Sequence, residues 1–175
     1  MAIIRPAWRT RRVRNSIIAF LLGAVLGTGF GVALGFFAFP FVFPPPPAAE
    51  VLSDREKGAS VLAAGTFIHA NPSDPLHYGK GSVEVREGSV FLKEDFEVGP
   101  GPKFHVYLVP KAPVRSEADV TGTMFVDLGQ LRAFKGSQRY ALPPGLDASK
   151  FGSVVIWCEH FSVLISPADL KHKGA

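Results

Sequence analysis

The sequence has only one cysteine, Cys158, among its 175 residues. An internal disulfide and a zinc site made of several cysteines are therefore excluded, and the lack of a Cys-x-x-Cys-His motif argues against covalent c-type haem. Hydrolytic motifs are also missing, because the chain has no Gly-x-Ser-x-Gly elbow, no His-Glu-x-x-His pair and no glycine-rich phosphate loop after a strand. The remaining chemistry centres on a single thiol.

Charge is absent from residues 17–43. This apolar run is longer than the roughly 20 helical residues that cross a hydrocarbon core of about 30 Å, so it predicts a transmembrane helix. The run also exceeds the apolar core of a cleaved signal peptide and ends in Phe-Pro-Phe-Val-Phe rather than in small residues. Cleavage after the pair Ala48-Ala49 is the rival interpretation, and an uncleaved anchor is favoured.

Acidic residues are absent ahead of this run, where five arginines gather: Arg5, Arg9, Arg11, Arg12 and Arg14. The positive-inside rule predicts a cytoplasmic leader at 1–16, a lipid-embedded anchor at 17–43 and an extracytoplasmic remainder. The remainder has 14 basic and 15 acidic residues, so it is nearly neutral despite the overall net charge of +4. We therefore expect membrane lipid and no nucleic acid among the partners.

Glycine recurs at every fourth position of the anchor, at Gly23, Gly27, Gly31 and Gly35. On a helix these residues form one flat stripe, and such stripes let two helix backbones approach closely. The spacing predicts a packing face for a second copy of the chain or for another membrane protein.

Residues 44–64 are predicted to be a proline-rich stalk and linker. Four consecutive prolines at 44–47 favour a stiff polyproline II segment. Further on, the run from Ser53 to Glu56 resembles a capping box for a short helix, but Gly58 follows too soon after it for a helix to be assigned. The segment 48–64 is therefore left without assigned secondary structure.

Residues 65–175 are predicted to form one antiparallel β domain, a sandwich or a barrel-like sheet. Short alternating runs separated by turn residues, at a spacing of about 8–12 residues, are typical of these folds. A hairpin turn is expected at residues 87–89. The candidate strands are 66–69, 82–86, 90–96, 104–109, 124–128, 138–142 and 153–165, the last one bent or split.

Cys158 lies in the last of these strands. A lone thiol outside the cytoplasm is buried and inert, bonded to another chain, coordinated, or kept reactive. Strand alternation would place His160 on the face of Cys158 and Trp157 on the other, so the imidazole could lower the thiol pKa or share a metal ion. A free cysteine that packs as a small core hydrophobe is the alternative.

Further candidate ligands are His69, His77 and His105, the last of which shares a strand face with Tyr107. A blue-copper site uses two histidines and a cysteine, often with an axial methionine, but Met124 lies far from Cys158 in the sequence. Copper is therefore disfavoured. A non-covalent haem held by Cys158 or by a histidine stays open.

Several segments in order over residues 65–170 resemble the DM-thirteen domain family. The clearest are Gly65-Thr66-Phe67, His77-Tyr78-Gly79-Lys80-Gly81, Gly101-Pro102-Lys103-Phe104-His105-Val106-Tyr107-Leu108, Val126-Asp127-Leu128-Gly129 and Val154-Val155-Ile156-Trp157-Cys158. The resemblance implies a small β-rich domain of extracytoplasmic electron transfer whose cysteine is a bare thiol or a ligand to a prosthetic group such as haem. Lys103 departs from the pattern, because an acidic residue usually follows the Gly-Pro motif.

The leading expectation is an extracytoplasmic, membrane-anchored redox or electron-transfer module. Cys158 would be the redox or ligand residue, with His160 and His105 as candidate partners toward haem or a metal ion and Trp157 packed against the site. The alternative is a non-enzymatic binding or structural β domain with an inert cysteine. An intermolecular disulfide through Cys158 is a third hypothesis.

Overall fold

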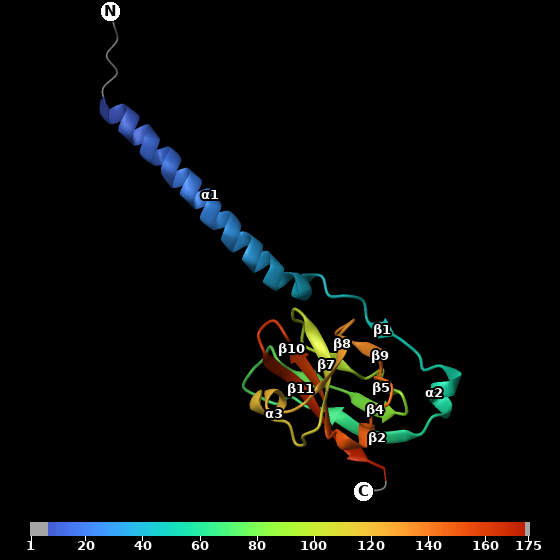
Figure 1. The fold of residues 1–175 in the computed structure, drawn as a ribbon. Helices are drawn as coiled ribbons and strands as arrows, with labels where there is room; N and C mark the ends of the chain where they lie inside the picture. Colours follow the sequence, from blue (N-terminus) through green and yellow to red (C-terminus); the bar gives the residue numbers. More distant parts are fainter. Residues whose placement is uncertain (1–6, 174–175) are drawn as a thin grey trace, which may run out of the picture. The chain divides into compact units, whose positions relative to one another are not determined.

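A computed structural model describes residues 7–173, and Arg5 of the basic leader lies outside this range. The chain divides into two compact units, Met1–Phe39 and Pro40–Ala175. Helix α1 (Ala7–Val42) fills the described part of the first unit and runs on into the start of the second (Figure 1).

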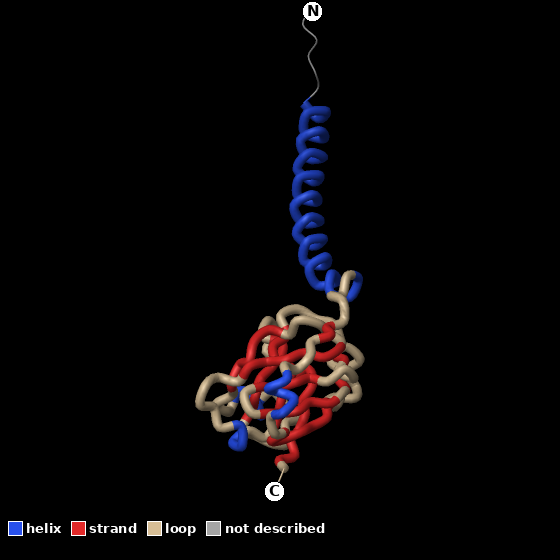
Figure 2. Tube along the Cα trace, turned by 90° about the vertical axis from the view of Figure 1, so that its right-hand side faces the viewer, coloured by secondary structure: helices blue, strands red, loops and turns tan. Residues whose placement is uncertain are grey.

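The apolar part of α1 is long enough to cross a membrane. Arg11–Val42 spans 32 residues and contains an 18-residue window with a mean hydropathy of 2.3, and it is the one helix in the described part of the chain that meets this criterion of length and composition. The helix includes Pro40 near its end, where the loss of one backbone hydrogen bond affects only the last turn. Figure 2 shows α1 as a continuous helical segment.

The second unit is a β domain with two short α-helices and one 3₁₀ turn (Figure 1). The helices are α2 (Asp54–Gly58) and α3 (Ala118–Thr121), and the 3₁₀ turn is Ala148–Lys150. The strands are β1 (Ala48–Ala49), β2 (Val61–Phe67), β3 (Gly79–Lys80), β4 (Ser82–Arg86), β5 (Ser89–Leu92), β6 (Glu97–Val98), β7 (Phe104–Val109), β8 (Val126–Gln130), β9 (Gly136–Ala141), β10 (Ser153–Cys158) and β11 (Val163–His172).

Nine of the strands found within residues 7–173 form one curled sheet in the order β1-β9-β5-β4-β2-β11-β10-β7-β8, and β3 pairs with β6. Neighbours in the large sheet are antiparallel except β1, which is parallel to β9. Figure 2 shows the strands wrapping around the interior of the domain. The predicted all-β, barrel-like fold is confirmed.

The main core fills the inside of the curled sheet. Alternate residues of β7 and β10 point into it, including Phe104, Val106 and Ile156, together with side chains from β2, β4, β5, β9 and β11. The residues between them point outward, so Tyr107 and Trp157 belong to a second buried cluster. The period-two pattern of strand residues 104–108 is therefore confirmed.

The segment 110–125 covers the outer face of β7 and β10. Val114 and Val120 are buried and pack against the outward-facing Tyr107, Val155 and Trp157. Arg115 fixes the segment to β11 through an ion pair with Asp169, at 2.6 Å between Nη2 and Oδ2. The domain thus has a second hydrophobic layer outside the sheet.

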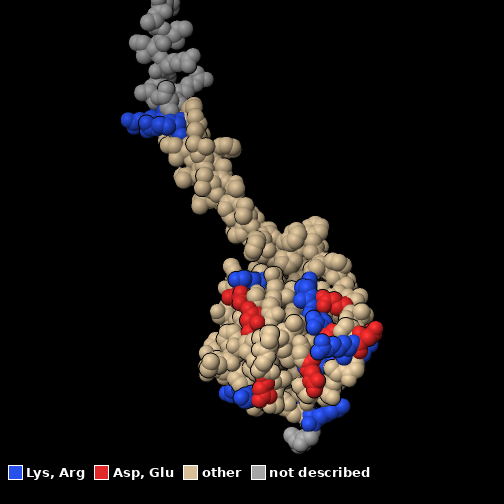
Figure 3. All heavy atoms as spheres, turned by 45° about the vertical axis from the view of Figure 1, so that its right-hand side comes forward, with Lys and Arg blue, Asp and Glu red and all other residues tan. Residues whose placement is uncertain are grey.

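Charged side chains of both signs are interleaved on the surface of the β domain, as Figure 3 shows for one face. Glu84 pairs with both Arg86 and Lys93, and Glu97 pairs with both Lys80 and Lys135. Such alternation leaves no extended field of one sign on these strands.

The linker before β2 is ordered against the domain. Strand β1 pairs with Gly136 and Ser137 of β9, and the carboxylate of Glu50 binds the Arg132 guanidinium through two hydrogen bonds of 2.6 and 2.9 Å. Gly136 has φ of +88°, and a Cβ there would collide with the backbone of Ala48, so the close approach of β1 requires glycine.

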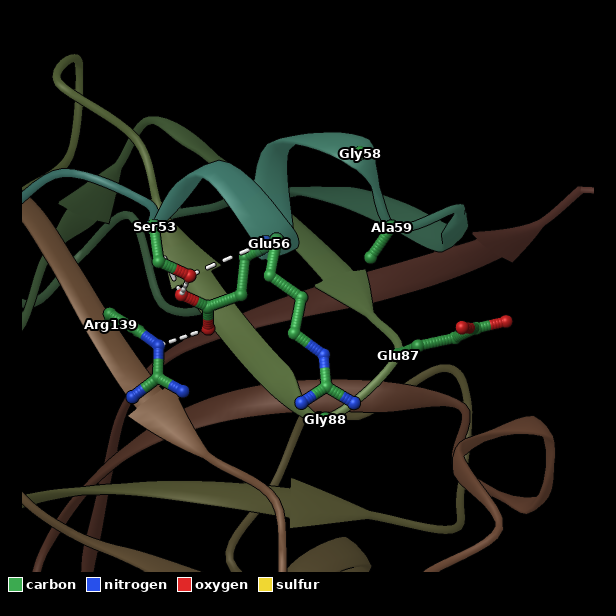
Figure 4. A pocket seen from close by; sticks show the side chains of 8 residues that line it. Ser53, Glu56, Gly58, Ala59, Glu87, Gly88 and Arg139 are labelled. Carbon is green, nitrogen blue, oxygen red and sulfur yellow. Dashed lines mark hydrogen bonds and ion pairs between the residues drawn. The ribbon is translucent and has the colours of Figure 1, made fainter.

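Helix α2 has a complete capping box: the Ser53 hydroxyl accepts from the Glu56 backbone, and the Glu56 side chain accepts from the Ser53 backbone. Glu56 also binds Arg139 of β9, as Figure 4 shows beside a pocket. The short helix exists despite Gly58 because both its cap and its tertiary contact hold it in place.

Candidate functional site

Cys158 ends strand β10 with its side chain inside the main core. Only 1% of the residue is exposed, and it shares its cluster with Phe104, Ile156 and Ile165. The Sγ donates to the Pro102 carbonyl at 3.4 Å, and burial is the largest cause of a raised thiol pKa. The sulfur is therefore a protonated thiol without an open face.

A haem or a metal ion bound through Cys158 does not fit this arrangement. The sulfur is packed among apolar side chains, and its polar neighbours are the Pro102 carbonyl and the backbone N–H groups of His160 and Phe161. A ligand site needs a deprotonated sulfur and further donors around the ion. Among the described residues, the one group of three or more close metal-ligating side chains does not include Cys158.

His160 does not share a strand face with Cys158, so that sequence-based expectation was wrong. Strand β10 ends at Cys158, and residues 159–162 form the turn to β11, in which His160 is exposed with its ring against Phe161 at 4.7 Å between centroids. Ser162 completes the turn with φ of +54°, in the left-handed region. The roles of Cys158 and His160 toward a cofactor remain predictions.

His69 and His77 lie in the loop between β2 and β3. The Nε2 of His69 lies 2.7 Å from the Asp74 carbonyl, and the Nδ1 of His77 lies 2.6 Å from the Asp74 carboxylate. Both rings therefore hold this loop together, away from the strand position of Cys158.

His105 belongs to a polar cluster on the outer face of β7, opposite to Cys158. It pairs with Trp157 in the β7–β10 register, whereas Cys158 pairs with Phe104. Its Nδ1 lies 2.9 Å from Asp127 Oδ2 on β8, and its Nε2 lies 3.5 Å from Glu159 Oε2. The imidazole thus stands between two carboxylates.

Lys103 and Tyr107 complete the cluster from either side of His105. The Lys103 Nζ lies 3.0 Å from Glu159 Oε2, and this hydrogen bond is the largest cause of the lowered Glu159 pKa. The Tyr107 hydroxyl donates to Glu159 Oε1 at 3.1 Å. Glu159 is therefore held as a carboxylate by the ammonium group and the phenol.

The Tyr107 ring lies in an aromatic stack. Phe125 stacks on it with centroids 4.4 Å apart and planes 12° apart, and Trp157 lies on it at 6.1 Å and 22°. Tyr107 and Trp157 are almost fully buried, whereas Phe125 is 38% exposed. Burial, followed by the bond to Glu159, raises the pKa of Tyr107, so the phenol is protonated at neutral pH.

A metal ion would find its best donors at His105, Asp127 and Glu159. One ligand atom of each lies within 4.8 Å of the others, and such a nitrogen and oxygen set suits divalent ions. The two nitrogens of His105 already contact different carboxylates, and Lys103 contacts Glu159. These ion pairs join His105, Asp127, Glu159 and Lys103 to one another, so protein groups alone hold the cluster together.

Sequence reasoning did not single out Asp127 or Glu159 as site residues. Asp127 comes to His105 only through the β7–β8 pairing, which has an irregularity between His105 and Tyr107. Glu159 had a usable signal, because it follows Trp157 by two residues and so continues the outward face of β10. The outer cluster thus includes one of the three predicted site residues, His105.

One of the comparisons with known proteins identifies a family. A family model described as electron transfer DM13 matches residues 72–170, which include strands β3 to β10, most of β11 and the whole outer cluster. No curated protein and no solved structure matches the chain. Since the match covers more than half of the chain, the protein belongs to the DM13 family of electron-transfer domains.

Proposed function

We propose that the protein is a single-pass, membrane-anchored electron-transfer module whose β domain works outside the cytoplasm. The family supports a general redox role. The apolar segment Arg11–Val42 supports anchoring, and the arginines at its start with no acidic residue before Glu50 support a cytoplasmic N-terminus.

The aromatic stack of Tyr107, Phe125 and Trp157 is the observation that supports a route for the electron through the domain. Tyrosine and tryptophan are the side chains of the stack that can lose an electron, and Phe125, which is 38% exposed, stacks on Tyr107. A redox partner that contacts Phe125 is separated from the buried phenol by one ring. The outer face of β7 and β10 is therefore the proposed place of electron exchange.

Cys158 is the other candidate redox group, as a thiol or as a ligand. Its role requires the core around the sulfur to open, because the thiol is buried and protonated. The same burial favours a second candidate function, a binding or structural β domain in which Cys158 is an ordinary core residue.

The experiment compares electron exchange in the full chain, purified in detergent micelles without oxygen. Hexachloroiridate(IV) serves as the one-electron oxidant, and electrons given up per chain are counted for wild type, Cys158→Ser and the double variant Tyr107→Phe/Trp157→Phe. We expect wild type and Cys158→Ser to react alike and the double variant to lose most of the rapid phase.

Two other results would contradict this assignment of the redox group. Loss of exchange in Cys158→Ser alone would assign the redox role to the thiol. No exchange by wild type, with neither bound metal nor visible absorption, would contradict the electron-transfer proposal and leave the binding or structural function.

A further inference from the structure

The outer cluster contains an unbroken line of proton-accepting groups that begins at a buried phenol. Tyr107 donates to Glu159 at 3.1 Å, Glu159 contacts His105 at 3.5 Å, and His105 contacts Asp127 at 2.9 Å. Tyr107 is 4% exposed at the start of the line, and the side chains of Glu159, His105 and Asp127 are 25%, 14% and 38% exposed. The line therefore connects the interior with solvent.

Regular strand geometry places the four groups side by side. His105 and Tyr107 alternate on the outward face of β7, and Tyr107 pairs with Asp127 of β8 in the register. Glu159 follows β10 directly, and its backbone N–H donates to the Lys103 carbonyl at 3.2 Å. The sheet thus fixes Tyr107 and Asp127, the two ends of the line, while the turn after β10 supplies Glu159 between them.

The surroundings of the Tyr107 ring are dry. Val114, Val120 and Leu164 share its buried cluster, and Phe125 covers one of its faces. A cation left in such a place would be costly, so a phenol that loses an electron there must also lose its proton. Its hydroxyl hydrogen bonds to Glu159, which the Lys103 ammonium keeps ionised at neutral pH.

We propose that Tyr107 is the redox-active residue of this domain and that Glu159, His105 and Asp127 carry its proton to solvent. The inference rests on the proposed electron-transfer function and names the group that performs it. It gives the cluster around His105 a role in moving protons.

Oxidation of Tyr107 transfers one electron and one proton. A high-potential one-electron oxidant, such as an oxidised metal centre of a partner protein, gains one electron, and Tyr107 becomes a neutral phenoxyl radical. The phenol O–H bond breaks, and a new O–H bond forms on Glu159. His105 accepts this proton at Nε2 and gives its Nδ1 proton to Asp127, whose exposed carboxylate passes it to water. A one-electron reductant reverses every transfer.

Tyr140 provides a matched control within the same domain. It is as buried as Tyr107, but its hydroxyl donates to the Gln138 amide oxygen at 2.9 Å, and the Arg132 guanidinium lies 4.3 Å from its ring centroid. An amide is a poor proton acceptor, and a cation over the ring opposes oxidation. Tyr140 should therefore resist the oxidation that Tyr107 undergoes.

The test uses the full chain in detergent micelles and a photo-oxidised ruthenium polypyridyl complex, with electron paramagnetic resonance and transient absorption as readouts. Tyr78→Phe serves as the parent because Tyr78 is a third, partly exposed tyrosine. We expect a tyrosyl radical in this parent and in Tyr78→Phe/Tyr140→Phe, and none in Tyr78→Phe/Tyr107→Phe. Glu159→Gln keeps the shape of the side chain but loses the base, so radical formation should slow on the order of 100-fold. Wild type should react more slowly in D₂O than in H₂O, and this solvent isotope effect should be absent in Glu159→Gln.

The outcomes separate this inference from the proposed function. If wild type gives up an electron but the radical resides on Tyr140 or Trp157, or if Glu159→Gln reacts at the wild-type rate, the assignment of Tyr107 fails and electron transfer stands. If wild type gives up no electron, the proposed function fails. Tight binding of Zn²⁺ alone that His105→Ala abolishes would overturn the proton line in favour of a metal site.

Discussion

Adjacent residues of β10 face different environments. Trp157 belongs to the outer aromatic layer, whereas Cys158 lies in the main core, one position further along the strand. The period-two rule predicts this separation from sequence. The rule could not predict that the strand stops at Cys158, because the turn that follows lacks glycine and proline and depends on a left-handed Ser162.

Replacing Cys158 with alanine should destabilise the domain. The change removes a fully packed sulfur and its contact with the Pro102 carbonyl, so we expect a loss of about 1–3 kcal/mol in the free energy of unfolding. Denaturant unfolding of the full chain in micelles measures this, with the exposed Ser162→Gly as the control variant at a left-handed position.

The same thiol should be unreactive in the folded protein. A maleimide reagent should label Cys158 only in denaturant concentrations that unfold the β domain, because the raised pKa and the packing both oppose thiolate attack. Rapid labelling of the native protein at neutral pH would show that the core opens and would restore Cys158 as a redox candidate.

Among the elements, those with local signals were predicted best. The bounds of β4 and β7 match the prediction, and the turn at Glu87 and Gly88 joins β4 to β5. Strand β1 was missed because two alanines have no strand signal of their own, and only pairing with β9 and the clamp from Glu50 to Arg132 order them. Long-range contacts of this kind are not visible in local sequence.

The attachment of α2 should weaken in acid. Hydrogen bonding from Ser53 is the largest cause that lowers the Glu56 pKa to about 2, and the bond from Arg139 adds to it. A depressed pKa in the folded state stabilises the fold above the ordinary carboxyl pKa, and this contribution is lost as the pH falls from about 4.5 toward 2.

Amide hydrogen exchange of residues 53–59 measures the loosening of α2. The protection factor, which is the intrinsic exchange rate divided by the observed rate, should fall across that pH interval in wild type and should be low at every pH in Glu56→Gln. Equal protection of α2 in Glu56→Gln and wild type at pH 7 would show that the ion pair with Arg139 contributes nothing to the attachment.

The glycine stripe of α1 leads to a prediction about association in the membrane. A Cβ built at Gly23, Gly27, Gly31 or Gly35 meets no atom within 4 Å among the described residues, so the stripe presents bare backbone. Gly27→Leu/Gly31→Leu should abolish self-association or association with a membrane partner.

Crosslinking in native membranes is the measurement for the stripe. Gly29→Leu is the matched control, because Gly29 lies two residues from Gly27 and therefore on the other side of the helix. An unchanged crosslinking pattern in the double variant would remove the idea of a packing face.

For the whole molecule, charge asymmetry predicts the side of the membrane on which the domain works. A C-terminal reporter enzyme that is active only outside the cytoplasm should be active in wild type. Replacing the five arginines of residues 1–16 with glutamine, together with four lysines inserted after residue 43, should reverse the orientation and silence the reporter. An active reporter in the reversed variant would show that charge does not set the topology.

The docking of β1 onto β9 limits the freedom of the domain. Five residues, 43–47, separate the end of α1 from β1, and four of them are proline. Even fully extended, such a segment reaches only about 18 Å. A domain on so short a tether cannot search for distant partners. In the proposed membrane-anchored arrangement, its electron donor and acceptor must themselves reside at the membrane surface or diffuse to it, and the anchor then determines which encounters occur.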